Sequence, residues 1–224
     1  MSARPFVVAI DGPAASGKGT LARRLAERFG LAHLDTGKLY RAAALLVLEA
    51  QADPADPQAA AAAARRVKAP LLEDPRLGEE RIAKAASVVA AIPQVRAALL
   101  AFQQAFAACP PAPAPGTKAR GAVLDGRDIG SVVCPQADVK LFLTANPEVR
   151  ARRRLEELRG RGLPAIYESV LQDLKERDAH DSLRQAAPLR AAADAVVIDT
   201  TALDPDAVFA RAADLVARAL ARPR

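Results

Sequence analysis

The segment from Val7 to Thr20, VVAIDGPAASGKGT, constrains the fold more than any other part of the chain. A continuous apolar run leads into a turn bounded by glycines, and the turn leads into an amphipathic stretch. Glycines let the backbone N–H groups of such a turn point inward, and the N-terminus of the following helix adds positive potential. Lys18 then reaches the β- and γ-phosphates of a nucleotide. The sequence therefore predicts a buried strand, a phosphate-binding loop and a helix, in that order.

One detail of the loop separates classes of nucleotide-binding protein. The strict pattern has Ser or Thr directly after the lysine, whereas Gly19 stands between Lys18 and Thr20 here. This G-K-G-T spacing resembles nucleoside monophosphate kinases more than GTPases. A GTPase would also need an N-K-x-D motif, but the only asparagine, Asn146, is followed by proline. The predicted ATP-binding residues are Gly12, Pro13, Ala14, Ala15, Ser16, Gly17, Lys18, Gly19 and Thr20, together with Arg153.

Short apolar runs alternate with longer amphipathic segments along the rest of the chain, which indicates parallel strands joined by crossover helices. A chain of 224 residues with 51% hydrophobic residues can bury one sizeable core, so we expect one main domain of the α/β class. The first helix is predicted from Gly17 to about Phe29, and the last from about Pro205 to Leu220. The predicted strands are Phe6–Ile10, Ala32–Asp35, Ala122–Asp125, Val139–Thr144 and Ala195–Asp199.

Three stretches depart from this alternation. The alanine-rich stretch Ala55–Lys68 predicts a surface helix, and Leu71–Glu80, which is charged and interrupted by Pro and Gly, predicts a connector without a catalytic role. The Pro/Ala run from Cys109 to Gly121 cannot form a helix or an inner strand, so we expect an exposed loop or a short stiff spacer.

The net charge of +6 and the isoelectric point near 9.7 are compatible with nucleic acid, an anionic membrane surface or small anionic substrates as partners. Aromatic residues that would stack on bases make up only 4% of the chain, which disfavours nucleic acid. Cys109 and Cys134 lack the spacing of a metal site or a disulfide framework, so a cytoplasmic location is expected. No apolar run approaches the ~20 residues that span a bilayer, and a soluble, unexported protein is expected.

Four further segments lie in a fixed order after the loop. Together with the loop they resemble the motifs of bacterial cytidylate kinases. They are HLDTGKLYR from His33 to Arg41; Ala85–Ser87 followed by Val95 and Arg96; DGRDIG from Asp125 to Gly130; and KERD from Lys175 to Asp178, continued by Asp181 and Arg184.

The resemblance implies a three-layer P-loop sandwich with a five-stranded parallel sheet flanked by helices. It implies one kinase domain over residues 1–224, with a core at 5–41, 120–146 and 185–224, an insertion that binds the nucleoside monophosphate at about 42–108, and a helical lid at about 147–165. The implied reaction transfers the γ-phosphate of ATP to CMP or dCMP. Mg²⁺ is the implied cofactor, with Asp125 holding it through water. A monomer without membrane or nucleic-acid partners is expected.

Residues for the acceptor follow from the same resemblance. Thr36, Arg41, Arg127 and Arg184 are assigned to its phosphate. A guanidinium can hold a phosphate bidentately, although a solvated helix arginine is the alternative for Arg41.

The resemblance assigns Ser87, Arg96 and Asp128 to the base. The Asp128 carboxylate can accept a hydrogen bond from the N4 amine of cytosine but would face the O4 acceptor of uracil. By itself, Ser87 is better explained as an incidental serine in an alanine-rich helix.

Two groups of charged residues have more than one interpretation. Arg177, Asp181 and Arg184 share a face of one helix, if that helix continues, and mutual ion pairing explains them as well as contact with substrate does. The resemblance assigns Arg177 and Asp181 to the ribose hydroxyls. The arginine-dense run Glu148–Gly162 fits a nucleic-acid patch or, better, a kinase lid that neutralises the transferring phosphate. The predicted catalytic residues are Lys18, Arg127, Arg150, Arg154 and Arg184.

No histidine is needed as a general base, because the acceptor phosphate has a second pKa near ~6 and is largely dianionic at neutral pH. We interpret His33 as a structural residue on a short inner strand and His180 as a surface residue. Two rivals remain at this stage: a kinase with the same scaffold that acts on another nucleotide or a small alcohol, and a non-enzymatic regulator that binds ATP or RNA.

Overall fold

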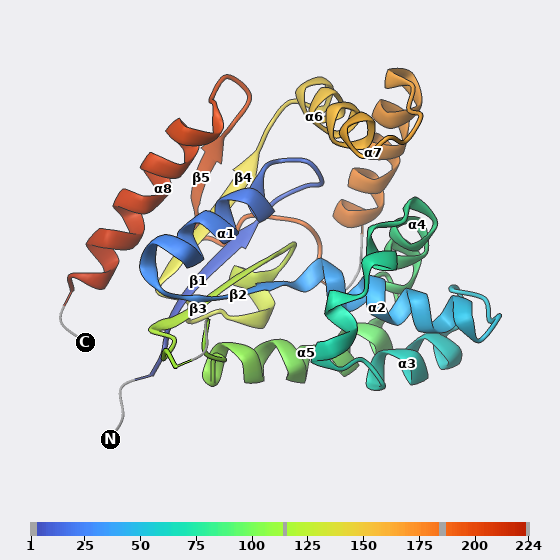
Figure 1. Ribbon diagram of the computed structural model, residues 1–224, viewed down its shortest axis with the longest axis horizontal. Helices are drawn as coiled ribbons and strands as arrows, with labels where there is room; N and C mark the ends of the chain where they lie inside the picture. Colours follow the sequence, from blue (N-terminus) through green and yellow to red (C-terminus); the bar gives the residue numbers. More distant parts are fainter. Residues whose placement is uncertain (1–3, 114–115, 184–186, 223–224) are drawn as a thin grey trace. The chain divides into compact units, whose positions relative to one another are not determined.

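The computed structural model describes residues 4–113, 116–183 and 187–222 (Figure 1). The chain divides into two compact units. Unit 1 comprises Met1–His33 and Ala107–Arg224, and unit 2 comprises Leu34–Phe106. Each unit is described below by itself.

Unit 1 is built on a five-stranded parallel sheet flanked by helices, which confirms the predicted fold class (Figure 1). The strand order is β2-β3-β1-β4-β5. Strand β2 lies at the edge of the sheet, so the expected inner position of His33 is wrong. The boundary between the two units falls within this strand. The observed strands agree with the predicted ones to within one residue at each end: β1 Phe6–Asp11, β2 Ala32–Asp35, β3 Gly121–Gly126, β4 Val139–Thr144 and β5 Val196–Asp199.

The central strands explain why the sequence reads as continuous apolar runs rather than alternating ones. Every residue of β1 and of β3 is buried, as expected where helices cover a parallel sheet. In the register of the sheet, Val8 lies opposite Val123 on one side and Val139 on the other, and Asp11 lies opposite Gly126. Asp11 and Gly126 therefore end their strands at the same edge, where open α/β sheets bind their ligands.

Helices α1 (Lys18–Phe29) and α8 (Pro205–Leu220) pack against each other and against β1, β4 and β5 in one hydrophobic core. Gly30 ends α1 in a left-handed conformation, with a φ of 64°. Asp204 is the N-cap of α8, because its side chain accepts hydrogen bonds from the backbone N–H groups of Asp206 and Ala207. Both helices confirm the predicted bounds to within one residue.

A helix pair follows β4. Helix α6 (Pro147–Gly160) and helix α7 (Tyr167–Leu183) pack through their own small core, which contains Ala151, Leu158, Val170 and Leu174. Ala14 of the predicted phosphate loop packs against this core. The helix pair and the loop are therefore in direct contact within unit 1.

Unit 2 is helical throughout its described elements after β2. They are α2 Thr36–Glu49, α3 Pro57–Arg65, the 3-10 helices η1 Ala69–Glu73 and η2 Pro75–Gly78, α4 Glu80–Val89, and α5 Pro93–Ala108, which continues into unit 1.

Unit 2 contains the helix predicted in Ala55–Lys68 as α3. It lies at the surface, with Gln58, Ala62 and Arg65 exposed, and it buries one face, Ala60, Ala61, Ala63 and Ala64, as it packs on α2. The small side chains of alanine permit this close helix packing. The predicted connector Leu71–Glu80 contains parts of two short 3-10 helices, η1 and η2, which bury Leu72 and Leu77.

The Pro/Ala segment has no helix or strand in its described residues 109–113 and 116–120, as predicted. Its expected last residue, Gly121, instead begins β3.

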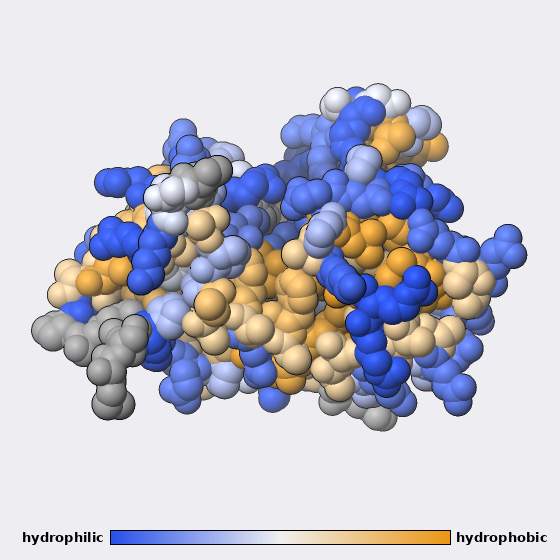
Figure 2. All heavy atoms as spheres, turned by 60° about the horizontal axis from the view of Figure 1, so that its bottom comes forward, coloured by the Kyte–Doolittle hydropathy of each residue, from blue (hydrophilic) through white to orange (hydrophobic). Residues whose placement is uncertain are grey.

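Figure 2 shows hydrophobic side chains on the right-hand half of one face, divided by hydrophilic ones rather than forming an unbroken surface.

Within the described residues, no single helix is long and apolar enough to cross a membrane. The bent pair α4 and α5, with 102° between its members, passes the same test by length and composition only.

Candidate functional site

The predicted phosphate loop joins β1 to α1 at the carboxyl edge of the sheet. Three residues adopt positive φ values there: Gly12 at 153°, Ala15 at 57° and Gly17 at 90°. A Cβ on Gly12 would lie 2.3 Å from the carbonyl oxygen of Leu143, so the loop passes too close to β4 for any side chain at this position. Helix α1 begins at Lys18 with no acidic residue in its first turn, which leaves its N-terminal potential positive.

Two polar side chains show that this loop is suited to an anion. The Lys18 Nζ donates to the Pro13 carbonyl at 3.1 Å, which folds the lysine back over the loop. The Ser16 hydroxyl is buried, and no hydrogen-bond partner for it exists among the described residues. A buried hydroxyl without a partner is costly unless a ligand supplies one. A phosphate oxygen in the loop would do so.

A cavity of about 560 Å³ opens beside the loop, lined by residues 15–21 together with Arg153, Thr200 and Val208. Arg153 is fixed at its wall, because it donates to the Thr200 hydroxyl at 2.9 Å and to the Thr200 carbonyl at 2.6 Å. A cavity of this size next to a phosphate loop has room for a nucleotide.

The other two predicted lid arginines lie in different environments. Arg150 is 3% exposed, and its guanidinium bonds the Asp178 carboxylate at 2.5 and 3.2 Å, the Ala145 carbonyl and the Ala14 carbonyl in the loop. Arg154 is partly exposed and pairs with Glu157 at 2.8 Å. In this structure Arg150 is therefore held against the loop.

The segment after β3 is joined to the base of the phosphate loop by Asp11. Its carboxylate accepts hydrogen bonds from the backbone N–H groups of Ile129 at 2.7 Å and Gly130 at 2.8 Å. These groups begin a π-helical turn, Ile129–Val133, directly after the buried Asp128. Burial raises the pKa of the Asp11 carboxyl to about 6, with the nearby Asp128 charge adding to the shift and the two hydrogen bonds opposing it.

This raised pKa predicts a pH-dependent contribution of Asp11 to stability. A folded-state pKa above the unfolded value of 3.8 means that the contribution is full below about pH 4 and is lost as the pH rises through about 6. The shift corresponds to about 3 kcal/mol. Asp11→Asn removes this titration, so the unfolding free energy of the wild type minus that of the variant should fall by about this amount between pH 4 and 7 in urea denaturation. A pH-independent difference would contradict the prediction.

Two predicted acceptor residues, 54 positions apart in the sequence, meet in unit 1. The Arg127 Nε donates to the Asp181 carboxylate at 2.7 Å, and Asp181 is 1% exposed. Arg177 is half-buried one turn before Asp181 on α7. Arg184 lies outside the described residues. The structure thus brings Arg127 and Asp181 together as an ion pair.

Asp125 lies at the end of β3 beside the phosphate loop. Its Oδ1 is 2.7 Å from the His33 Nε2, and its Oδ2 is 3.8 Å from the position that a Cβ on Gly19 would take. His33 is therefore a partner of the predicted metal-associated carboxylate, which supports its structural interpretation.

Unit 2 carries the remaining predicted acceptor residues. Thr36 is buried at the start of α2, and Asp35 caps this helix by accepting from the Gly37 N–H. Arg41, one turn later, donates to the Leu77 carbonyl at 2.9 Å. Ser87 is half-buried on α4.

The fourth of these residues, Arg96, lies in the first turn of α5. Its guanidinium lies 5.6 Å from the centre of the Tyr40 ring, and its Nη1 is 3.4 Å from the Ala90 carbonyl. Unit 2 thus places Arg96 beside the helix that carries Arg41.

Sequence reasoning missed several residues that orient the predicted ones. Asp178 holds Arg150, Asp11 holds the turn after Asp128, and Tyr40 lies against Arg96. Asp178 and Tyr40 belong to motifs already recognised, KERD and TGKLYR, and Asp11 directly precedes the loop. Each was visible as a polar or aromatic residue inside a motif, but its partner lies far away in the sequence.

Comparisons with known proteins agree on one family. A family model described as cytidylate kinase matches residues 8–218. A cytidylate kinase from Rhodospirillum rubrum is 56% identical over 212 residues, which cover 95% of this chain and 97% of that protein. A cytidylate kinase from Methylobacterium sp. (strain 4-46) is 62% identical over 190 residues, which cover 85% and 86% of the two proteins.

Solved structures bear on the fold alone. The crystal structure of an uncharacterized protein from Eubacterium ventriosum has a TM-score of 0.50 at 14% identity, covering 96% of this chain and 97% of that one.

Proposed function

Because the chain belongs to the cytidylate kinase family, it is a nucleoside monophosphate kinase, and we propose how its residues transfer the γ-phosphate of ATP to CMP or dCMP. The products are CDP or dCDP and ADP. The observation that carries the proposed ATP site is the buried Ser16 hydroxyl, which has no partner among the described residues and lies in a loop at the N-terminus of α1.

On the ATP side, residues Gly12–Thr20 hold the phosphates with backbone N–H groups. Lys18 neutralises the β- and γ-phosphates, and Arg153 and Arg154 add positive charge from α6. Arg150 acts from a fixed position, because its contacts with Ala14 and Asp178 brace the loop against the helix pair. Phosphoryl transfer depends mainly on such alignment and charge.

Mg²⁺ fits this site as a companion of ATP rather than as a protein-caged ion. Within the described ranges, no group of three or more His, Cys, Asp or Glu side chains is arranged to hold a metal. Asp125, buried beside Gly19 and bonded to His33, would hold the ion through water. Mg²⁺ characteristically keeps several waters and binds through one or two carboxylates plus substrate phosphates. When bound, it neutralises developing charge on the phosphates.

On the acceptor side, each unit supplies its own residues. Thr36 and Arg41 of unit 2, with Arg127 and Arg184 of unit 1, bind the phosphate. Ser87, Arg96 and Asp128 bind the cytosine base, while Arg177 and Asp181 bind the ribose. The Arg127–Asp181 pair at 2.7 Å supports this assignment, because it preorganises two residues proposed for the same substrate.

No side chain is required to remove a proton from the acceptor. A phosphate with a second pKa near ~6 is largely dianionic at pH 7 and is already a nucleophile. His33 is engaged with Asp125, and His180 is exposed on α7. The proposed mechanism therefore contains no general base.

A coupled assay with CMP, dCMP, UMP, AMP, GMP and shikimate as acceptors tests the proposed function. CMP and dCMP should give the highest kcat/KM. If another nucleotide or the alcohol is preferred, the acceptor assignment is wrong. Tight, salt-sensitive RNA binding without phosphotransfer would instead support a non-enzymatic regulator.

Asp128→Ala is expected to reduce the preference for CMP over UMP. The substitution removes the acceptor for the cytosine N4 amine and the repulsion against the uracil O4, a discrimination of roughly 1–3 kcal/mol for a good contact. The measurement is the ratio of kcat/KM for CMP to that for UMP in the wild type and the variant. An unchanged ratio would exclude Asp128 from base recognition.

We further propose that the chain acts as a monomer in the cytoplasm. Cys109 and Cys134 are both free thiols, which suits a reducing compartment. Light scattering coupled to gel filtration tests the oligomeric state.

A further inference from the structure

We infer that Arg76 is a positioning residue for the phosphate acceptor: it fastens the 3-10 helix η2 to the end of α2, and η2 in turn presents Arg41. The inference rests on the proposed function, in which Arg41 binds the acceptor phosphate. Arg76 lies in the connector that the sequence suggested to be without a catalytic role.

The first step is the contact between Arg41 and η2. The Arg41 Nη1 donates to the Leu77 carbonyl at 2.9 Å, and the Leu77 side chain is buried in unit 2 at 3% exposure. A guanidinium has five N–H donors in a rigid plane, so one bond to a carbonyl orients the plane without using all of its donors. The Leu77 carbonyl is therefore one of the contacts that orient Arg41.

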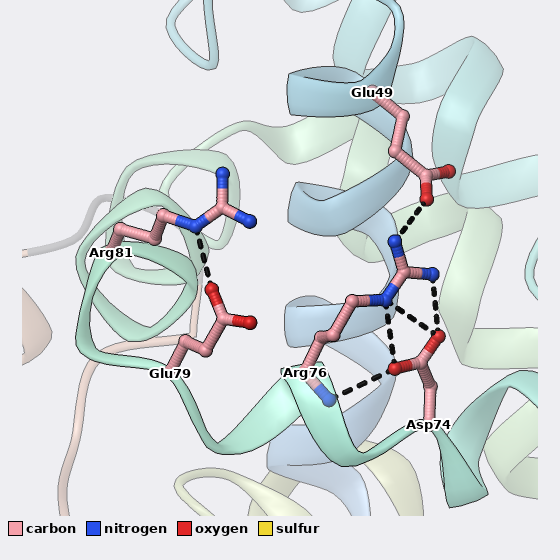
Figure 3. A network of polar contacts seen from close by, with 5 residues as sticks. All are labelled: Glu49, Asp74, Arg76, Glu79 and Arg81. Carbon is pink, nitrogen blue, oxygen red and sulfur yellow. Dashed lines mark hydrogen bonds and ion pairs between the residues drawn. The ribbon is translucent and has the colours of Figure 1, made fainter.

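The second step is the attachment of η2 to α2 by the neighbouring residue, Arg76 (Figure 3). The Arg76 Nη1 bonds the carboxylate of Glu49, the last residue of α2, at 2.7 Å. Its Nε and Nη2 bond the Asp74 carboxylate at 2.6–3.1 Å, and Asp74 also caps η2 by accepting from the Arg76 backbone N–H at 2.9 Å. One guanidinium thus joins the cap of η2 to the end of α2.

The two attachments of η2 lie at different points along α2. Arg41 and Glu49 are eight residues apart, which is about 12 Å along an α-helix. A segment fixed at one point can pivot, whereas a segment fixed at two separated points cannot. Without Arg76, η2 loses its attachment to the end of α2, and burial of the Leu77 side chain and the Arg41 contact remain to hold the Leu77 carbonyl.

We expect this charged cluster to affect the position of η2 more than the stability of the fold. Arg76 and Glu49 side chains are 46% and 43% exposed, and exposed ion pairs contribute little to folding. Through its hydrogen bonds, the Arg76 guanidinium lowers the pKa of Asp74 below its ordinary value. Removing Arg76 should therefore alter substrate binding more than the melting temperature.

The same segment contains a matched control. Arg81 pairs with Glu79 at 2.6 Å and, like Arg76, bonds an acid two residues before it (Figure 3). Both members belong to the start of α4, so this ion pair joins α4 to its own cap rather than to α2. Arg81→Ala removes the same charge from the same surface without releasing η2 from Glu49.

The experiment compares Arg76→Ala with Arg81→Ala in the coupled assay. Arg76→Ala should raise the KM for CMP roughly three- to fivefold, as expected for the loss of an exposed ion pair. The kcat and the KM for ATP should change less than about twofold, since ATP binds elsewhere. Arg81→Ala should leave all three constants near those of the wild type.

Arg41 variants separate this inference from the proposed function. Arg41→Ala and Arg41→Lys, the second of which keeps the charge but loses the planar fork, should both raise the KM for CMP. If neither does, the proposed role of Arg41 fails. If they do, Arg76→Ala should have no further effect in the Arg41→Ala background, because Arg76 acts through Arg41.

Three results would overturn the role of Arg76 while leaving that of Arg41 intact. They are equal effects of Arg76→Ala and Arg81→Ala on the KM for CMP, full additivity of Arg76→Ala with Arg41→Ala, and a lower KM in Arg76→Ala. The last would mean that η2 restrains Arg41 instead of presenting it.

Discussion

Replacing Lys18 by alanine should reduce kcat roughly 100- to 1,000-fold, the cost of removing one preorganised charge at a transferring group. Lys18 begins α1, and its ammonium folds back over the loop to the Pro13 carbonyl, so it lies where the phosphates of ATP would bind. The charge on these phosphates grows and spreads during transfer, and a missing ammonium is therefore felt most in the transition state. The assay measures kcat at saturating ATP and CMP.

Two companion variants make this result interpretable. Lys18→Met keeps most of the length of the side chain but not its charge, and it should be nearly as inactive as Lys18→Ala. Lys68→Ala removes an exposed lysine of unit 2 and should retain full activity. A Lys18→Ala enzyme with more than about a tenth of the wild-type kcat, a loss below ~1.4 kcal/mol, would contradict the role of Lys18.

Gly12→Ala should damage both folding and ATP binding. A Cβ at this position would lie 2.3 Å from the backbone oxygen of Leu143, and the φ of 153° already disfavours a side chain. Neither β1 nor β4 can move away easily, because the two strands are paired at the centre of the sheet. We expect a loss of about 3 kcal/mol or more in the free energy of unfolding, from steric overlap and backbone strain together.

Gly160→Ala is the matched control, since a Cβ on Gly160 at the end of α6 would meet no atom within 4 Å. Alanine favours helix over glycine, so this variant should be unchanged or more stable by up to ~1 kcal/mol. Urea denaturation gives both values, and titration with ATP gives the binding constant. A Gly12→Ala protein as stable as the wild type, with normal ATP affinity, would contradict the prediction, because it would show that the loop can move enough to accommodate a Cβ.

The parts of the fold predicted from the sequence are those that depend on neighbouring residues. The strands are continuous apolar runs, and α1 and α8 end or begin at Gly30 and Asp204, whose effects are local. The edge position of β2 depends on which strands pair, and no local signal in AHLD specifies that. Which face of α3 packs on α2 could not be read from the sequence for a related reason, because alanine is compatible with both solvent and a tight helix contact.

The site divides in the same way. Lys18 and Asp128 stand in motifs whose chemistry can be read locally, but the pairs Arg150–Asp178 and Arg127–Asp181 join residues 28 and 54 positions apart. An arginine in a charged helix has many possible partners, so the sequence alone could not distinguish a mobile Arg150 from one that is 3% exposed and braced against Ala14. The contribution of Leu77 was hidden because it comes from a backbone carbonyl, a group that every residue has whatever its side chain.

The strand order of unit 1 has a consequence for the behaviour of the protein at high concentration. Both edge strands, Ala32–Asp35 and Val196–Asp199, are only four residues long, and each ends in an aspartate. Unpaired edge groups can template intermolecular strand pairing, and β5 also exposes Val196 and Val197. Edges this short offer a second molecule few backbone groups to pair with, which limits growth of the sheet into an aggregate.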